Sequence, residues 1–296
     1  MPETAYKPAQ WEKVDCPFCG SAESKLYERF GSELQYTYVK CGHCGLIYSS
    51  PRPKYDQHFI DAAYGSYYQF ADNLELDDST SISESSVPMF LEEIEYVSQY
   101  DKDKTAVLDI GSGMGSFLYA AKKKGYPLCV GLDVSEQMAK FIERKLGVKV
   151  YIGQFESFDY PGQFSLIHMS HVLEHVPNPN EWLEKAKSLL TPGGVLVINV
   201  PHKYSMGNRL QHFFVKAGLK KQFSASWSNP ARTPDHLFEP TLPSLKFLVE
   251  KHGFEIIEMY TYSRKDPASN KSLPARLMNR VLKKGSNIAC IVRKRD

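Results

Sequence analysis

The sequence predicts an α/β protein with a doubly wound, mostly parallel sheet and a small metal-binding module ahead of it. Two observations predict the sheet. From residue 105 onward, short apolar runs alternate with segments whose apolar residues recur at helical spacing. The first of these runs leads into a glycine-rich turn that ends at Gly115, as a strand–turn–helix unit does. A third observation, two Cys-x-x-Cys pairs between residues 16 and 44, predicts the module.

Strands are expected where short apolar runs are bounded by glycine, proline or polar residues. In chain order the expected strands of the sheet are 105–110, 128–132, 148–152, 164–169, 195–200, 254–262 and 287–292. The run at 195–200 is almost wholly apolar, as in a strand buried on both faces. Two short strands, 33–39 and 46–48, are expected around the second cysteine pair.

Helices are expected between the strands, with capping residues at their ends. The expected helices are 89–100, 115–124, 135–146, a segment that starts at Asn180, 245–252, and a basic amphipathic helix at 274–284. Ser135 is expected to cap its helix and Gly147 to end it, whereas Asn180 is expected to cap the helix that stops at Pro192.

The 296-residue chain suits one large domain and a small one. We expect a zinc-binding module at 1–53, a tyrosine-rich and acidic linker with a helix at 54–100, and the α/β domain at 101–296. Within the linker, Tyr67 and Tyr68 either close over a ligand or pack locally. An insertion at 201–243 follows the last parallel strand and should form the wall of a substrate site.

The glycine turn carries an acidic residue ahead of it, Asp109, and a second acidic residue, Asp133, ends the next strand. Glycines let a backbone approach a ligand closely, and an acidic residue at the end of the second strand, as Asp133 is, suits ribose hydroxyls. A dinucleotide-binding turn needs glycine where Ser116 stands, so the spacing favours another nucleotide ligand. An ordinary strand–turn–helix corner is the alternative.

The cysteines fall as Cys16-Pro-Phe-Cys19 and Cys41-Gly-His-Cys44, with 21 residues between the pairs. Two such knuckles present four thiolates tetrahedrally, which predicts a closed, structural zinc site without a position for water. A thioredoxin-like redox pair is the rival, but neither pair lies in a βαβ context. We expect the module and the α/β domain to have separate cores.

The pattern Asp-x-Gly-x-Gly-x-Gly resembles the cofactor loop of class I S-adenosylmethionine (AdoMet) methyltransferases. Ordered matches continue through 131–135, 153–156, 164–176 and 190–196. The resemblance implies a Rossmann-like, seven-stranded sheet and an AdoMet site. The residues that it places in the site are Asp109, Gly111, Gly113, Gly115, Asp133, Val134, Gln154, Phe155 and Ser170. Gln154 and Ser165 stand where such enzymes often have aspartate.

A Cys-x-x-Cys module ahead of this domain resembles methyltransferases that act on sugars and other small metabolites. The resemblance implies a small-molecule acceptor, a saccharide or nucleotide sugar, and O-methylation is favoured. One alternative is an RNA methyltransferase whose zinc module grips the RNA, but residues 1–50 carry five basic and six acidic side chains, a poor footprint for nucleic acid. A non-catalytic zinc-module scaffold is the alternative from another class.

An oxygen acceptor must lose a proton, and histidine is the usual base. Three histidines are candidates: His236 in the insertion, favoured as the base, and His171 and His175 after the fourth strand. His175 has the alternative role of orienting its loop by a hydrogen bond. The spacing of His171 and His175, with Glu174 between them, also suggests a metal-binding site as an alternative.

Charge is distributed unevenly although the net charge is only +2. Residues 263–296 carry ten basic and two acidic side chains, so this tail either is a solvated helix face or makes weak contact with an anionic surface. No apolar run approaches the ~20 residues of a membrane span, and the first residues lack an apolar signal core. We therefore expect a cytoplasmic protein, in which the cysteines stay reduced.

Overall fold

The central sheet has seven strands in the order β12-β13-β10-β9-β6-β7-β8. The computed structural model describes residues 8, 10–30, 35–63, 82, 87–202, 235–262 and 285–295. The strands are β6 (Ala106–Ile110), β7 (Leu128–Asp133), β8 (Lys149–Ile152), β9 (Phe164–Ser170), β10 (Leu190–Pro201), β12 (Phe254–Tyr262) and β13 (Asn287–Lys294). Strands β10, β9, β6, β7 and β8 are parallel, and β13 runs antiparallel to both of its neighbours. The expected α/β fold, with a seven-stranded, mostly parallel sheet, is confirmed.

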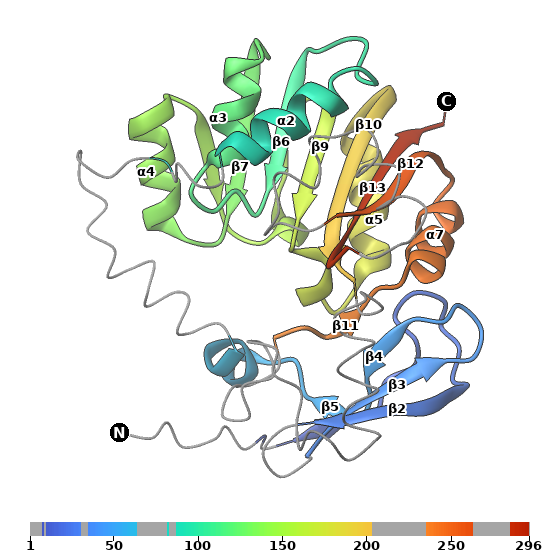
Figure 1. Ribbon diagram of the computed structural model, residues 1–296. Coiled ribbons are helices and arrows are strands. Elements are labelled where there is room, and N and C mark those ends of the chain that lie inside the picture. Colours follow the sequence, from blue (N-terminus) through green and yellow to red (C-terminus); the bar gives the residue numbers. More distant parts are fainter. Residues whose placement is uncertain are drawn as a thin grey trace.

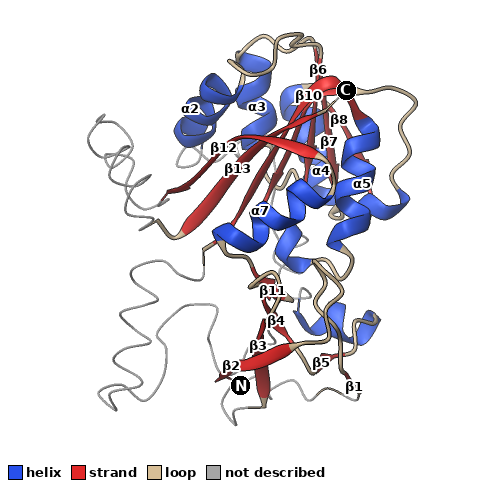
Figure 2. Ribbon diagram, turned by 90° about the vertical axis from the view of Figure 1, so that its right-hand side faces the viewer, coloured by secondary structure: helices blue, strands red, loops and turns tan. Residues whose placement is uncertain are grey.

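Helices cover both faces of this sheet (Figures 1 and 2). They are α2 (Val87–Val97), α3 (Ser116–Lys123), α4 (Glu136–Leu146), α5 (Pro179–Leu189) and α7 (Leu242–Lys251), with short 3₁₀ turns η1 (Phe155–Ser157) and η2 (Leu173–His175). Successive residues of a strand point to opposite faces, so one strand feeds two cores. In β9, Leu166 packs in the core that contains residues of α2, α3 and α4, whereas Ile167 packs in the core that contains residues of α5 and α7.

The helix ends test the expected caps. Ser135 caps α4 as expected, because its hydroxyl accepts a hydrogen bond from the Met138 N–H, and Gly147 ends the helix at φ 62°. The expectation for Asn180 is wrong: the N-cap of α5 is Asn178, and Asn180 lies in the first turn. This helix ends at Leu189, and β10 begins at Leu190, before Pro192. The pairing of β10 with β9 shifts register between Leu190 and Val195, the stretch that contains Gly193 and Gly194.

The cysteine-containing module is a four-stranded antiparallel sheet in the order β11-β4-β3-β2. Its strands are β2 (Ser24–Phe30), β3 (Tyr36–Cys41), β4 (Ile47–Ser49) and β11 (Phe238–Glu239), and β1 (Trp11–Glu12) pairs with β5 (Arg52–Pro53) beside it. Strand β11 comes from the expected insertion, almost 200 residues further along the chain, and links the two sheets (Figure 1).

The expectation of separate cores is wrong. Cys16, Phe18 and Leu46 of the module belong to one continuous hydrophobic cluster with residues of the central sheet, α5 and α7. The Phe18 ring meets Phe238 of β11 edge to face, with 5.0 Å between the ring centroids. Burial of apolar surface drives this merger, because a module of about 50 residues cannot bury enough of its own.

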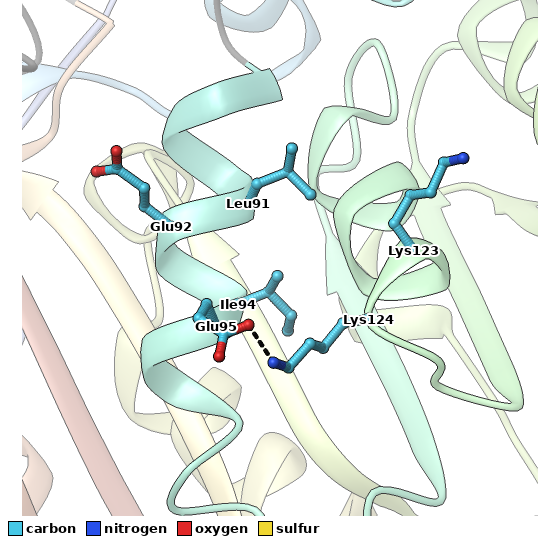
Figure 3. A pocket seen from close by; sticks show the side chains of 6 residues that line it. All are labelled: Leu91, Glu92, Ile94, Glu95, Lys123 and Lys124. Atoms are coloured by element: carbon cyan, nitrogen blue, oxygen red, sulfur yellow. Dashed lines mark hydrogen bonds and ion pairs between the residues drawn. The ribbon is translucent and has the colours of Figure 1, made fainter.

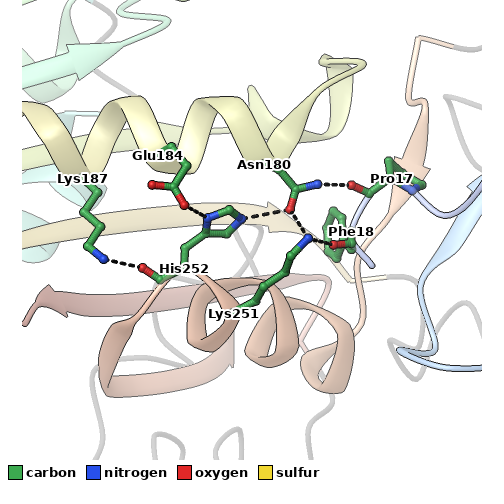
Figure 4. A network of polar contacts seen from close by, with 7 residues as sticks. All are labelled: Pro17, Phe18, Asn180, Glu184, Lys187, Lys251 and His252. Carbon is green, nitrogen blue, oxygen red and sulfur yellow. Dashed lines mark hydrogen bonds and ion pairs between the residues drawn. The ribbon is translucent and has the colours of Figure 1, made fainter. Parts of the chain in front are cut away.

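Polar contacts hold the first cysteine knuckle onto α5 and α7 (Figure 4). Lys251 Nζ donates to the Phe18 carbonyl and to Asn180 Oδ1, both at 2.8 Å. Asn180 also donates to the Pro17 carbonyl, and its Oδ1 lies 2.9 Å from His252 Nε2. This network explains why Asn180 is not a cap: its side chain is used by the module.

Several sequence-derived expectations lie outside the described residues, namely Tyr67, Tyr68, the helix at 274–284 and most of the 201–243 insertion. The helix expected at 89–100 is α2, and the linker before it contains helical residues at 57–63. Across the described ranges, every helix is too short or too polar to cross a membrane.

Candidate active site

The glycine turn follows β6 at the carboxyl edge of the sheet. Gly111, Gly113 and Gly115 all have positive φ, at 73°, 49° and 76°, a region that other residues enter at a cost. A Cβ on Gly111 would lie 2.5 Å from a methyl of Val172, and one on Gly115 would lie 2.9 Å from Ile142. A Cβ on Gly113 would meet nothing within 4 Å, so this glycine faces open space.

Asp133, at the end of β7, joins the glycine turn to α4. One carboxylate oxygen accepts the Gly113 N–H at 2.7 Å, and the other accepts the Ser135 N–H at 2.9 Å. The residue is 6% exposed, and burial raises the pKa of its carboxyl. A carboxylate has about four acceptor positions. Acceptor positions are therefore left for a ligand such as the hydroxyls of a ribose.

The surface beside Asp133 is apolar and open. Val134 is 44% exposed and Ile152, at the end of β8, is 55% exposed. Gln154 is exposed as well, in the position expected to border an adenine ring. Phe155 differs from the other expected cofactor residues, because its ring is buried against Trp182 with centroids 5.0 Å apart. Its main chain, not its ring, is what Phe155 can offer to a cofactor.

Asp109 is buried beside a histidine that sequence reasoning missed. His168 Nδ1 lies 2.7 Å from Asp109 Oδ1, and its ring stacks on Phe117 of α3 with 3.7 Å between the centroids. Burial alone would lower the pKa of His168, but Asp109 and Glu93 raise it to about 9. The pair fixes the strand end from which the glycine turn starts.

The three candidate histidines gather around Glu174, just past the end of β9. Ser170 ends that strand and is half-buried. His171 Nδ1 lies 3.3 Å from Glu174 Oε1, and His175 Nε2 lies 3.9 Å from the same oxygen. The rings of His175 and His236 are 4.9 Å apart. Residues that are some 60 positions apart in the sequence therefore form one cluster.

The surroundings distinguish these histidines. His236 Nδ1 lies 3.0 Å from Glu239 Oε1. Burial would lower the pKa of His236, but Glu239, with Glu174 and Asp235, raises it to about 9. His175 has its pKa lowered by burial, and its Nδ1 lies 2.9 Å from the Asp235 carbonyl. His171 adopts φ 56° and precedes Val172, the residue packed on Gly111. Of the three candidate histidines, His171 is therefore the one next in sequence to Val172, which contacts Gly111 of the glycine turn.

The four cysteines of the knuckles also come together. Cys16 Sγ lies 3.4 Å from Cys44 Sγ, and Cys19 Sγ lies 3.5 Å from Cys41 Sγ. A tetrahedral ion with Zn–S bonds of about 2.3 Å would hold its sulfurs about 3.8 Å apart, so the cluster fits zinc with small shifts. Burial would raise the pKa of Cys41, but N–H donors from Cys44 and His43 lower it to about 7. Without an ion, the neighbouring thiol Cys44 raises the pKa of Cys16, and burial raises that of Cys19.

A pocket of about 320 Å³ between α2 and α3 lies away from this chemistry (Figure 3). Leu91 and Ile94 line it together with the paired Glu95 and Lys124. Lys124 follows the last residue of α3, whereas the glycine turn precedes the first. The pocket is therefore at the end of the helix remote from the glycine turn.

Comparison with known proteins identifies the α/β domain. Residues 88–259, more than half of the chain, match the family model described as "Methyltransferase domain". An uncharacterized protein of Methanocaldococcus jannaschii is 34% identical over 94 residues, which is 31% of this chain and 43% of that protein. A ubiquinone biosynthesis O-methyltransferase of Pseudomonas aeruginosa is 31% identical over 100 residues, with the same two shares. The chain spans less than half the length of these relatives.

Solved structures share the fold at low identity. The 1,6-didemethyltoxoflavin-N1-methyltransferase of Burkholderia thailandensis has a TM-score of 0.54 and 15% identity, with 91% of this chain and 100% of that chain covered. The magnesium protoporphyrin IX methyltransferase of Synechocystis has a TM-score of 0.51 and 14% identity, with 80% and 97% covered. The family match, the strand order of the central sheet and the glycine turn all indicate the same fold. The chain belongs to the methyltransferase domain family, and its α/β domain has the fold of these solved methyltransferases.

Proposed function

We propose that the protein methylates a hydroxyl group of a small molecule, and that the acceptor is a saccharide or a nucleotide sugar. The observation that carries the proposal is the placement of two groups at one edge of the sheet. The Asp133–glycine turn fits the ribose of AdoMet, and the histidine cluster follows β9 at the same edge. Among similar proteins, one is named a ubiquinone biosynthesis O-methyltransferase and another is a toxoflavin-type N1-methyltransferase, so small molecules are the acceptor class in both names.

His171 is proposed as the base in place of His236, which the sequence favoured. With a pKa raised to about 9, His236 carries a proton at neutral pH and cannot accept another. The Nε2 of His171 is buried and has no hydrogen-bond partner. It would take the proton of the acceptor hydroxyl, whose oxygen then forms a bond to the methyl carbon as the carbon–sulfur bond breaks. When bound, AdoMet supplies that methyl group and leaves as S-adenosylhomocysteine.

The cysteine cluster is proposed to hold one structural zinc ion. All four Sγ atoms lie within 4.8 Å of one another, and four thiolates leave no position for water. Its role would be to stabilise the module sheet, which carries β11 and thereby fixes the wall that contains His236. A cytoplasmic location and contact of the basic tail with an anionic surface stay predictions.

The test is a methyl-transfer assay with methyl-labelled AdoMet and a panel of nucleotide sugars, glycans, quinol precursors and structured RNAs. Label in a saccharide, lost in His171→Ala at unchanged AdoMet affinity, is the expected result. Label in RNA alone would refute the acceptor class. Full turnover by His171→Ala together with an inactive His236→Ala would return the role of base to His236.

A further inference from the structure

Glu174 is a buried carboxylate without a hydrogen bond. Its side chain is 0% exposed, and neither oxygen has a hydrogen-bond partner. An unpaired buried charge is costly, so such a group ordinarily has a cation against it. The imidazoles nearest to it are those of His171, whose Nδ1 lies 3.3 Å from Oε1, and of His175, whose Nε2 lies 3.9 Å from Oε1. Glu174 is therefore a buried carboxylate that is surrounded by imidazoles and has both oxygens without a hydrogen bond.

Two imidazoles face this carboxylate in a fixed orientation. Glu174, His175 and His236 each offer a ligand atom, and these atoms lie within 4.8 Å of one another. The Nδ1 of His175 is placed 2.9 Å from the Asp235 carbonyl, and that of His236 is placed 3.0 Å from Glu239 Oε1. Metal-bound histidines use their second nitrogen in this way, because a carbonyl or carboxylate on one nitrogen orients the other toward the metal.

The backbone holds the two halves of the cluster together. The Leu237 N–H donates to the Glu174 carbonyl at 2.9 Å, and the Leu237 carbonyl accepts from the Ser49 N–H at 2.9 Å. Residue 237 thus connects η2 to β4 of the cysteine-containing module. A ligand set built on such a ladder is preformed and does not depend on the ion for its assembly.

We propose that Glu174, His175 and His236 bind a divalent transition-metal ion, separate from the cysteine site, that coordinates the oxygen of the acceptor. Two imidazoles and one carboxylate suit Mn²⁺, Fe²⁺, Co²⁺ or Zn²⁺ and leave positions open for substrate. His171, whose Nδ1 is 3.3 Å from Glu174 Oε1, lies beside this position. The ion would favour the alkoxide form of the acceptor and assist the base.

The role in catalysis rests on the proposed function, but the binding of the metal does not. A coordinating imidazole must be neutral, so protons and the ion compete for the nitrogens of His175 and His236. The rival account is that protons on the histidines alone neutralise Glu174. The two accounts differ in whether the full-length protein binds an ion in the absence of AdoMet and acceptor.

The probe is Mn²⁺, which prefers nitrogen and oxygen ligands and competes poorly for thiolates. The full chain is treated with a chelator, and elemental analysis verifies that zinc on the cysteines is retained. Electron paramagnetic resonance then measures Mn²⁺ binding. One tightly bound Mn²⁺ is expected, with affinity reduced at least 100-fold in Glu174→Gln and in His236→Gln. The exposed His58 supplies the matched control, since His58→Gln should bind as the unmodified protein does.

Should the variants fold poorly, the unmodified protein still decides the question. Electron spin echo measurements on bound Mn²⁺ should show ¹⁴N coupling from imidazole, and bound Mn²⁺ without such coupling would overturn the assignment. So would weak Mn²⁺ binding that is unchanged in Glu174→Gln. His171→Ala should bind Mn²⁺ normally. Methyl transfer by metal-free protein would refute the metal's role alone, whereas tight Mn²⁺ binding without methyl transfer to any hydroxyl would refute only the proposed function.

Discussion

The hydroxyl of Tyr38 donates a hydrogen bond to the carbonyl oxygen of His236, at 3.1 Å across 198 residues of sequence. Tyr38 lies in β3 of the cysteine-containing module, next to the strand that pairs with β11. The position of a candidate active-site histidine is thus set by the N-terminal module as well as by the α/β domain.

Asp133→Asn should weaken AdoMet binding at least tenfold, with the far-ultraviolet circular dichroism spectrum unchanged. An amide offers one acceptor in place of two and carries no charge, whereas Asp133 accepts from both Gly113 and Ser135. Each charged hydrogen bond contributes about 1.5–3 kcal/mol. Calorimetric titration with AdoMet measures the loss. Glu136→Gln is the control, since this carboxylate is exposed and pairs with Lys140; equal dissociation constants for both variants would contradict the ribose assignment.

Gly111→Ala and Gly113→Ala should separate the packing of the glycine turn from its contact with the ligand. At Gly111 the added methyl would clash with Val172, and alanine would also have to adopt a positive φ. The free energy of unfolding should therefore fall by roughly 2 kcal/mol or more. At Gly113 the methyl enters open space, so the free energy of unfolding should fall by only about 1 kcal/mol, while AdoMet affinity falls. Chemical denaturation and calorimetry give both quantities. A Gly113→Ala protein that binds AdoMet normally would show that the open side is not the ligand side.

Cys41→Ser should abolish zinc binding and lower turnover at least tenfold, with AdoMet affinity retained. Without the ion the module sheet loses its anchor, and β11 and His236 lose their support. Asp133 and the glycine turn bond within the α/β domain, so the nucleotide site should persist. Elemental analysis, turnover and AdoMet titration are measured together. Cys129→Ser in β7 is the control; it should cost stability and keep the zinc, and full activity of a zinc-free Cys41→Ser protein would contradict the coupling.

His168→Gln should destabilise the protein in a pH-dependent way. The pKa of His168 is raised to about 9 in the folded state, from an ordinary value of 6.5. Its stabilising charge is therefore fully present below pH 6.5 and is lost as the pH rises through about 9. The difference in unfolding free energy between the two proteins, at most about 3 kcal/mol from this cause, should shrink across that range. Denaturation at pH 6 and pH 9.5 measures it, and a constant difference would mean that His168 is not charged beside Asp109.

Local features of the chain were predictable from sequence because their causes are local. The glycine turn, the Ser135 cap and the end of α4 at Gly147 follow from backbone conformation and short-range hydrogen bonds. The order of the elements then favours the doubly wound sheet. Clustering of the cysteines likewise follows from their spacing.

The missed features depend on long-range contacts. Strand β11 has two residues, too few for any periodicity, and its partner β4 lies far away in sequence. In the sequence, His168 is only a polar residue within an apolar strand. Its role becomes visible when the register of β6 and β9 places it opposite Asp109. Asn180 has a side chain suited to a cap, but Lys251 and His252 compete for it. Only the assembled fold brings these partners together.

Strand β4 has its outer edge covered by β11, and this pairing has a consequence for synthesis on the ribosome. Translation proceeds from the N-terminus, so the cysteine knuckles and β4 emerge long before residues 238 and 239. Throughout that interval the nascent chain presents an unprotected strand edge, which is a template for pairing with other chains. Early capture of the zinc ion would keep this half-built sheet in its native register until the closing strand arrives.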